Sequence, residues 1–192
     1  MTRISLSQFR LGAVAASLLT AATACGGGLG LPSPVFENIV DTTTLFALQG
    51  TAITSPSAFD VVSGRRTRTQ LAEPFDFAFD IDETGKPILL PREVLGLRTA
   101  AGILLADTPF NSVLRAPTED YITDSAIPIE EETTFVARSR AASQTCSFLG
   151  ALPRYGKFRV LTLDPQQRTV TLELLVNRNC GYRDLEPGLP TS

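Results

Sequence analysis

The segment PFDFAFDID, residues 74–82, alternates apolar and mostly acidic side chains with a period of two. In an extended chain, successive side chains point to opposite faces of a sheet. One face of this segment is therefore apolar, and the other face is mostly acidic. We predict a strand whose buried face is Phe75, Phe77, Phe79 and Ile81 and whose solvent-exposed face is Asp76, Ala78, Asp80 and Asp82.

Two hairpins follow from this pattern and from the turn sequences. Gly85 lies in ETGKP, a turn sequence between the first strand and a second apolar run, so residues 74–90 form one predicted hairpin. Near the C-terminus, Asp164-Pro165 opens a turn between two further alternating segments. Before the turn, one row of side chains alternates with another, and after the turn a single row forms one face of the return strand. The rows before the turn are Phe158, Val160 and Thr162 against Arg159, Leu161 and Leu163, and the row after it is Val170, Leu172, Leu174 and Val176.

Weaker strand patterns occur along the rest of the chain, separated by turn sequences at intervals of about ten residues. Helix is scarce, and one short helix is expected to begin at Pro91. The chain is therefore predicted to be all-β, a single β-sandwich or barrel-like domain of roughly eight to ten short antiparallel strands. The weaker patterns cover residues 43–50, 57–62, 66–71, 100–106, 112–116 and 133–140.

The first 25 residues have the three parts of an export signal. Arg3 and Arg10 supply positive charge, residues 11–20 are apolar or small, and small residues lead up to Cys25. An apolar run of about ten residues is half of what spans a bilayer, which favours a signal peptide over a membrane-spanning helix. Two interpretations of the cleavage site fit. The A-x-A sequence 22–24 would release a soluble protein with a free cysteine, whereas ATAC resembles the lipobox of bacterial lipoproteins.

The lipobox resemblance implies a bacterial protein in which Cys25 is acylated and becomes the first mature residue. Ala22 stands where that family most often has leucine. The resemblance divides the chain into a signal peptide, residues 1–24, a Gly- and Pro-rich tether, residues 25–34, and a β-rich domain, residues 35–192. It also implies contact with the membrane through the lipid on Cys25, with the domain in the periplasm or at the cell surface. Because Gly26 is not the aspartate that retains some lipoproteins in the inner membrane, we expect the outer membrane.

The remaining cysteines, Cys146 and Cys180, flank the second hairpin. In an exported protein, such a pair is most simply a disulfide. A redox-active pair usually has close spacing such as C-x-x-C, which is absent here. We therefore predict a structural disulfide.

Histidine is absent from all 192 residues, which excludes the commonest catalytic and metal-binding chemistry. Ser-His and Cys-His nucleophiles, His-ligated zinc and His general bases are ruled out. No phosphate-binding glycine motif occurs, and no cofactor is expected. Loss of Arg3 and Arg10 with the signal leaves 15 basic against 20 acidic residues, a balance that does not attract nucleic acid. A pair of carboxylates is the catalytic device that remains.

One short motif, DIDETG at residues 80–85, resembles the start of a calcium-binding loop. It follows the pattern D-x-D-x-T-G and offers oxygen ligands from Asp80, Asp82 and Thr84. The twelfth position of the pattern requires glutamate, and Pro91 occupies it, so a β-turn is the stronger interpretation and no metal site is predicted. The basic residues Arg65, Arg66 and Arg68 and the acidic residues 130–132 are interpreted as solvated strand and turn.

Three classes of function remain. The favoured hypothesis is a membrane-tethered, non-catalytic module that presents a β-sandwich in the cell envelope, with loops at its ends for binding. The second is an accessory subunit of an envelope complex, which would contact a protein partner through an apolar patch or a sheet edge. The third, a carboxylate-based hydrolase, is least favoured. A buried acidic pair in a cleft would support the enzyme, and an exposed apolar surface would support the subunit.

Overall fold

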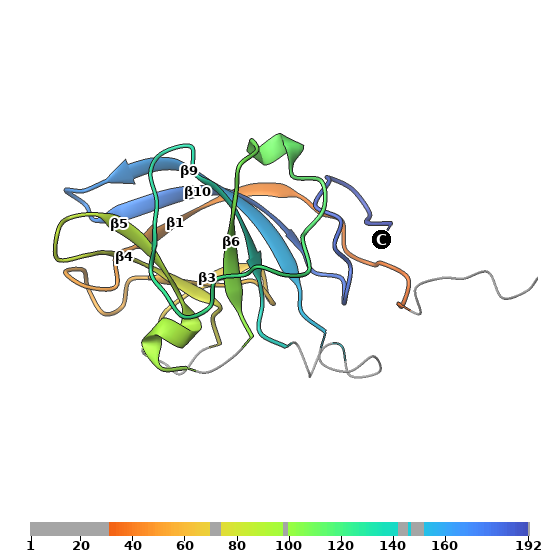
Figure 1. Cartoon of the computed structure of the whole chain (residues 1–192), viewed down its shortest axis with the longest axis horizontal. Helices are drawn as coiled ribbons and strands as arrows, with labels where there is room; N and C mark the ends of the chain where they lie inside the picture. The colour runs from red at the N-terminus through yellow and green to blue at the C-terminus, as the bar shows by residue number, and fades with distance from the viewer. Residues whose placement is uncertain (1–30, 70–73, 98–99, 142–145, 147–151, 192) are drawn as a thin grey trace, which may run out of the picture. The chain divides into compact units, whose positions relative to one another are not determined.

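Two antiparallel sheets of five strands each pack face to face (Figure 1). The structure is a computed structural model, and it describes residues 31–69, 74–97, 100–141, 146 and 152–191. Within these residues the chain forms ten strands and two short 3-10 helices. The prediction of an all-β sandwich with little helix is therefore confirmed.

The first sheet has the strand order β1-β10-β9-β8-β6, so β1 and β6 are its two edges. Its two longest strands, β9 and β10, form the hairpin predicted near the C-terminus. The bounds are β1 Val40–Phe46, β6 Gly102–Ala106, β8 Thr134–Arg138, β9 Tyr155–Asp164 and β10 Thr169–Asn177.

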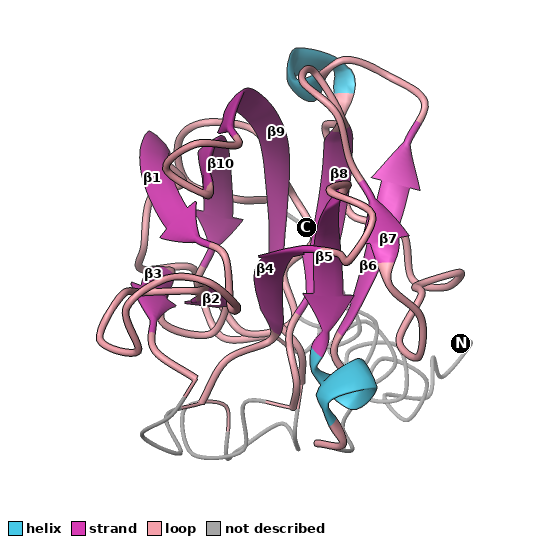
Figure 2. Cartoon of the chain, turned by 90° about the vertical axis from the view of Figure 1, so that its left-hand side faces the viewer, coloured by secondary structure: helices cyan, strands magenta, loops and turns pink. Residues whose placement is uncertain are grey.

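The second sheet has the order β3-β2-β4-β5-β7. The predicted hairpin over residues 74–90 is β4 and β5, and its turn contains Gly85 at a φ of 84°, a conformation that favours glycine. Figure 2 shows that β1 and β3 lie on one side of the sandwich and that β6 and β7 lie on the other. The bounds are β2 Ala58–Asp60, β3 Arg65–Thr67, β4 Phe77–Ile81, β5 Pro87–Pro91 and β7 Ile127–Pro128.

The two 3-10 helices are η1, Arg92–Leu95, and η2, Phe110–Ser112. The helix predicted at Pro91 is confirmed as η1, with Pro91 immediately before its first residue. The strand predicted over residues 112–116 is wrong. This segment begins at the last residue of η2, and it forms an isolated β-bridge, between Arg115 and Asp184, instead of a strand. Prolines flank the segment on both sides, and their missing N–H groups weaken any ladder there. The other five weak patterns each overlap a strand.

Four phenylalanines fill the space between the sheets. Phe59 and Phe77 belong to the second sheet, Phe135 and Phe158 belong to the first, and none is more than 1 % exposed. The ring of Phe158 lies 5.2 Å from that of Phe59 and 5.4 Å from that of Phe77, in both cases edge to face. Aromatic contacts of this kind contribute about 0.5–1.5 kcal/mol each beyond the area that they bury. The cluster therefore holds the two sheets together.

A β-bulge in β9 interrupts the alternation predicted for the second hairpin. Between Val160 and Thr162, Leu161 is left without an opposite residue in β10. The extra residue reverses the alternation of side chains beyond it. As a result Thr162, which was predicted in one row with Phe158 and Val160, is exposed, and Leu163 packs against the core instead. The row predicted in β10 is buried as expected: Val170, Leu172, Leu174 and Val176.

The second face of β4 is buried, which contradicts the prediction of a solvent-exposed acidic face. Asp76 is 1 % exposed, Asp80 is 4 % exposed and Ala78 is inaccessible. A separate apolar cluster covers this side of the second sheet. Alternation identified the two faces, but it could not show that loops and η1 would cover the second one. The members of this outer cluster are Ala58, Phe75, Ala78 and Leu90, with Leu48, Ile88 and Leu95 packed against them.

Phe75 was predicted to lie in the inner row, and this too is wrong. The N–H of Asp76 donates to the carbonyl of Phe59, which is also the residue that pairs with Phe77. Asp76 and Phe77 thus both lie opposite Phe59, as in a β-bulge. The alternation reverses at this point, so Phe75 packs in the outer cluster rather than with Phe77 and Phe79.

Two segments cover the outer face of the first sheet: residues 110–117 and the C-terminal strap, residues 181–191. They hold each other through backbone hydrogen bonds, one of them from Leu185 N–H to the carbonyl of Leu114. The strap then pairs with the N-terminal segment, because Gly188 and Asn38 exchange two hydrogen bonds. Figure 1 shows these two ends of the described chain side by side.

The predicted disulfide between Cys146 and Cys180 is present, with a Cα–Cα distance of 5.7 Å. This separation lies in the usual range for disulfides. The bond closes a loop that contains the whole β9–β10 hairpin, which is the longest hairpin of the first sheet.

Replacing both Cys146 and Cys180 by serine should lower the free energy of unfolding by about 3–4 kcal/mol. The two residues are 34 positions apart, and the chain entropy of an unfolded loop of about this length gives that magnitude. Chemical denaturation followed by circular dichroism measures the loss, and the β-rich spectrum of the folded variant should match the wild type. Equal midpoints for the oxidised and reduced wild-type protein would contradict a stabilising role.

Candidate functional site

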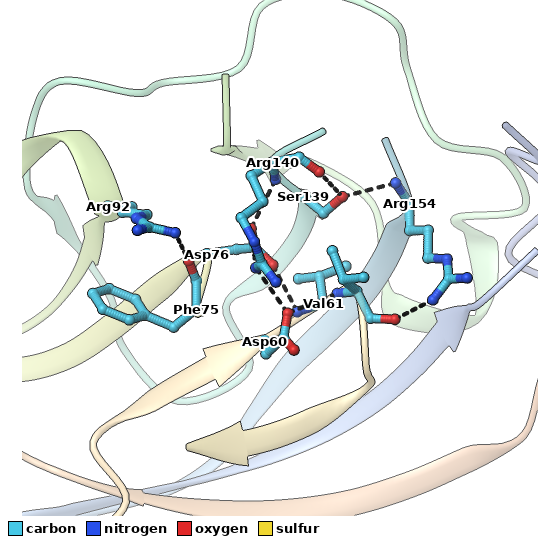
Figure 3. A network of polar contacts seen from close by, with 9 residues as sticks. Asp60, Val61, Phe75, Asp76, Arg92, Ser139, Arg140 and Arg154 are labelled. Atoms are coloured by element: carbon cyan, nitrogen blue, oxygen red, sulfur yellow. Dashed lines mark hydrogen bonds and ion pairs between the residues drawn. The ribbon is translucent and has the colours of Figure 1, made fainter. Parts of the chain in front are cut away.

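The most prominent cluster of charged side chains is formed by Asp60, Asp76 and Arg140, called here the Asp–Arg clamp (Figure 3). Asp60 is the last residue of β2, and Asp76 immediately precedes β4. Arg140 follows β8, so the acids belong to one sheet and the arginine to the other. The clamp thus joins the two sheets beside the phenylalanine core.

Asp76 has a partner for each of its carboxylate oxygens. Its Oδ2 accepts from Val61 N–H at 2.8 Å. Its Oδ1 accepts from the backbone N–H of Arg140 at 2.7 Å and from the guanidinium Nη1 of the same residue at 3.1 Å. A buried carboxylate needs such donors, because it has lost its hydration.

Arg140 is shared between both acids. Its Nη1 lies 2.8 Å from Asp60 Oδ1 and 3.1 Å from Asp76 Oδ1. Asp60 also accepts from Val62 N–H at 3.1 Å. One cation therefore holds two carboxylates that would otherwise repel each other.

Neighbouring backbone contacts fix the position of Arg140. The N–H of Ser139 donates to the carbonyl of Arg154, and the N–H of Arg154 donates back to Ser139 Oγ at 2.8 Å. The guanidinium of Arg154 then donates to the carbonyl of Val62, in the loop after β2. Figure 3 shows this second connection beside the clamp, so two arginines span the same junction.

Burial raises the pKa of Asp76 to about 6, and the charge of Arg140 opposes the shift. The negative charge of nearby Asp60 adds to it. Raised carboxyl pKa values occur at catalytic sites, but structural networks produce them as well. The geometry decides between these two interpretations.

The geometry makes the Asp–Arg clamp a structural device rather than a catalytic pair. Asp76 is 1 % exposed, and a general acid or nucleophile must lie within hydrogen-bond reach of its substrate. Its oxygens are already occupied by donors from three directions in the clamp. No local sequence pattern indicated this contact, because Arg140 and Asp76 are 64 residues apart.

The residues of the calcium-like motif lie in different surroundings. Asp80 is buried and accepts from the backbone N–H groups of Gln49 and Ile81. One oxygen of Asp82 accepts from Thr84 N–H, Thr84 Oγ and Lys86 N–H, each within 2.9 Å. These bonds lower the pKa of Asp82, with the Lys86 N–H the largest cause. Asp82 thus closes the β4–β5 turn, and in the described part of the chain no three acidic or thiol groups could hold a metal ion.

The two charged runs lie at the surface. Arg65 and Arg66 are exposed in β3, and Arg66 donates to the carbonyl of Thr44 at 3.3 Å. In the acidic run, Glu132 forms an ion pair with Arg159 at 3.3 Å. Both runs are therefore part of the solvated surface, as the sequence indicated.

The open edge of β6 is the second candidate site. Ile103 exchanges two backbone hydrogen bonds with Ile122, on the side away from β8. Because outward and inward hydrogen bonding alternate along an antiparallel strand, the N–H and C=O of Leu105 also point outward. Neither group has a partner among the described residues, so a short stretch of this edge is available for pairing.

A recess of about 470 Å³ lies along this edge. It is called here the β6 groove, and its walls are mostly apolar. Leu105 is 41 % exposed and Leu114 is 50 % exposed, although large aliphatic side chains are usually buried. The residues that line it include Leu104, Leu105, Val113, Leu114, Pro117 and Val136.

An acidic recess of about 460 Å³ adjoins the β6 groove, and the two share residues 105–108. Asp107 and residues 130–132 line the acidic recess together with Arg159. The surface beside β6 therefore changes from apolar to acidic over a few residues.

Lys157 fixes the wall of the β6 groove. Its side chain is buried beneath η2, and its Nζ donates to the carbonyls of Phe110 and Val113, each at 3.0 Å. Burial lowers the pKa of this lysine. The groove was not predicted from the sequence, because its wall is the segment mistaken for a strand. The flanking prolines, Pro109 and Pro117, were a usable signal.

Replacing Asp76 by asparagine should remove one component of the pH dependence of stability. Because the pKa of Asp76 is higher in the folded state, about 6 against 3.8, its contribution to stability is fully present below pH 3.8 and is lost as the pH rises through 6. The unfolding free energy of the wild type minus that of Asp76→Asn should fall by up to about 3 kcal/mol between pH 4 and pH 7.

Asp82→Asn is the matched control, since the pKa of Asp82 is lowered rather than raised. Its difference from the wild type should stay nearly constant between pH 4 and pH 7 and should fall only on acidification below pH 3.8, because a contribution from a lowered pKa is fully present above the unfolded value. Urea denaturation of the three proteins over this pH range measures both differences. A pH-independent difference for Asp76→Asn would refute a raised pKa.

Cys25 and the whole signal region lie outside the described residues, so acylation stays a prediction. Among the residues that the structure describes, no helix is long and apolar enough to cross a membrane. No known protein family matches this chain, and no curated protein matches it. Its function is therefore argued from the sequence and the geometry above.

Proposed function

We propose that this protein is a lipid-anchored, non-catalytic binding module of a bacterial cell envelope, which holds an extended segment of an envelope protein at the edge of β6. The proposal combines the lipobox-like sequence at Cys25 with the β6 groove. The groove is the observation that carries the binding role, because it places an unpaired backbone beside exposed aliphatic side chains.

A segment in extended conformation matches this edge. The outward N–H and C=O of Leu105 offer one donor and one acceptor to an added strand, and main-chain pairing of this kind gives affinity without much sequence preference. An apolar side chain of the partner fits against Leu114 and Val113. The adjoining acidic recess favours a partner with a basic residue next to its apolar one.

The alternative of a carboxylate hydrolase receives no support from the Asp–Arg clamp. Both acids are engaged by Arg140 and by backbone donors, and Asp76 is inaccessible to a substrate. Catalysis would require the clamp to open, which would leave buried charges without partners.

Mass spectrometry of the mature N-terminus tests the anchor. The expected first residue is Cys25 carrying acyl chains, in protein recovered from the membrane fraction. Two or three acyl chains bind a bilayer stably, whereas one chain does so only marginally. An unmodified N-terminal Cys25 in the soluble fraction would show that the anchor is absent.

Replacing Leu105 by proline tests the binding role, with Leu105→Val as the matched control. Proline removes the outward N–H and leaves the β6–β8 ladder intact, because edge strands tolerate proline where the N–H faces solvent. A photo-crosslinking residue at position 114 should form a discrete adduct in the cell envelope with the wild type and with Leu105→Val. With Leu105→Pro, the adduct should be reduced at least several-fold.

The same crosslinker at position 53, an exposed isoleucine in a different loop, controls for chance encounters. The thermal unfolding midpoint of Leu105→Pro shows whether the variant is folded. An adduct that is equally strong in folded Leu105→Pro, or equally strong at position 53, would overturn the binding role of the β6 edge.

A further inference from the structure

We infer that the surface formed by Val35, Phe36, Ile39 and Leu189 rests on the lipid bilayer. It is called here the apolar end. The inference rests on the proposed lipid anchor at Cys25, but it goes further, because it assigns the face of the domain that meets the membrane.

The apolar end combines four large hydrophobic side chains that are open to solvent. Val35 is 74 % exposed, Ile39 is 67 % exposed and Leu189 is 55 % exposed. Phe36 is 40 % exposed, and its ring lies 4.5 Å from the guanidinium carbon of Arg178. Exposed apolar residues that gather in one place indicate a contact surface, whereas single ones do not.

Pairing of the two chain ends brings these residues together. Asn38 and Gly188 exchange two hydrogen bonds, and the side chain of Asn38 is buried. Because side chains alternate along extended segments, Ile39 and Leu189 point away from the buried side of this pair. Ile39 and Leu189 therefore share one outward side, and Phe36 and Ile39 both adjoin Arg178.

The point at which the chain leaves the domain is fixed beside this surface. The hydroxyl of Tyr182 donates to the carbonyl of Pro32 at 3.0 Å. The side chain of Asn179 accepts from the N–H groups of Val35 and Phe36 and donates to the carbonyl of Phe36. These hydrogen bonds hold Pro32, Val35 and Phe36 against the domain.

The remaining connection to the lipid is short. Six residue steps separate Cys25 from Leu31, and at 3.3–3.6 Å per residue they reach at most about 22 Å. Leu31, which lies four residues before Val35, therefore stays within about 22 Å of an acyl anchor on Cys25, whatever path those residues take. At that distance the effective concentration of the bilayer at this surface is high.

The apolar end is suited to bind a membrane through hydrophobic contact rather than through charge. Glu37 and Arg178 line one recess together with Ile39, so opposite charges lie next to each other there. Exposed valine, isoleucine, leucine and phenylalanine are the side chains that insert at the boundary between head groups and acyl chains. Docking at this end should therefore depend little on salt.

Ile39 and Ile53 form a matched pair for the test. Ile53 is 76 % exposed, and it lies in the loop that follows the other end of the seven-residue strand β1. In the lipidated protein the three native thiols are blocked by acylation and by the disulfide, so Ile39→Cys or Ile53→Cys adds a single reactive thiol. Each variant is labelled with a fluorophore and placed in phosphatidylethanolamine–phosphatidylglycerol vesicles that contain a brominated-lipid quencher.

The label at position 39 should lose most of its fluorescence, and the label at position 53 should lose little. Leu189→Cys is a second site on the apolar end, and it should behave like Ile39→Cys. Mass spectrometry and vesicle flotation show whether the protein is acylated and bound, so failure of the anchor is recognised separately and would remove the basis of the inference. If the acylated, vesicle-bound protein shows equal quenching at positions 39, 189 and 53, the apolar end does not face the membrane.

Discussion

The edge-to-face packing of Phe158 against Phe59 and Phe77 is the interaction on which the rest of the structure depends. The second sheet has strands as short as two and three residues, which backbone pairing does not hold in place without support. Packing across the phenylalanine cluster supplies that support. It also positions the Asp–Arg clamp, because Asp60 follows Phe59 and Asp76 precedes Phe77 in the chain. The phenylalanine cluster thus determines where the Asp–Arg clamp lies between the sheets.

The sequence was sufficient for the fold class because period-two alternation and turn residues are local signals. Both hairpins, the scarcity of helix and the disulfide were predicted from such signals. Two of the errors, the facing of Phe75 and of Thr162, arose at Asp76 and Leu161, where one extra residue in a strand reverses the alternation. A bulge leaves no clear mark in composition, so a pattern that assumes regular pairing assigns the residues beyond it to the wrong face.

The candidate sites were harder to predict, since they depend on contacts between distant parts of the chain. Asp76 was expected on a wet face, because nothing local shows that Arg140 will neutralise it. The β6 groove requires residues 110–117 to lie over the first sheet, where Lys157 holds them through two carbonyls. A buried lysine needs acceptors, so it indicates that another segment covers this face of the strand. It does not identify that segment. In the metal-like motif, local turn chemistry accounts for Asp82 and Thr84, whereas Asp80 accepts from the N–H of Gln49, 31 residues away.

Pairing of the first strand with the last has a consequence for the order in which the domain folds. β1 lies beside β10, and Pro32 and Tyr182, which are joined by a hydrogen bond, are 150 residues apart. Strands β2 to β5 are neighbours along the chain and are able to pair early. The first sheet is complete only when β10, the last strand in the chain, has paired with β1. Contacts of such large sequence separation form slowly. If the chain is exported with its N-terminus first, as we propose, the segment after Cys25 would have no folded partner until translocation is nearly finished, and the proposed processing of that cysteine would precede closure of the domain around Pro32.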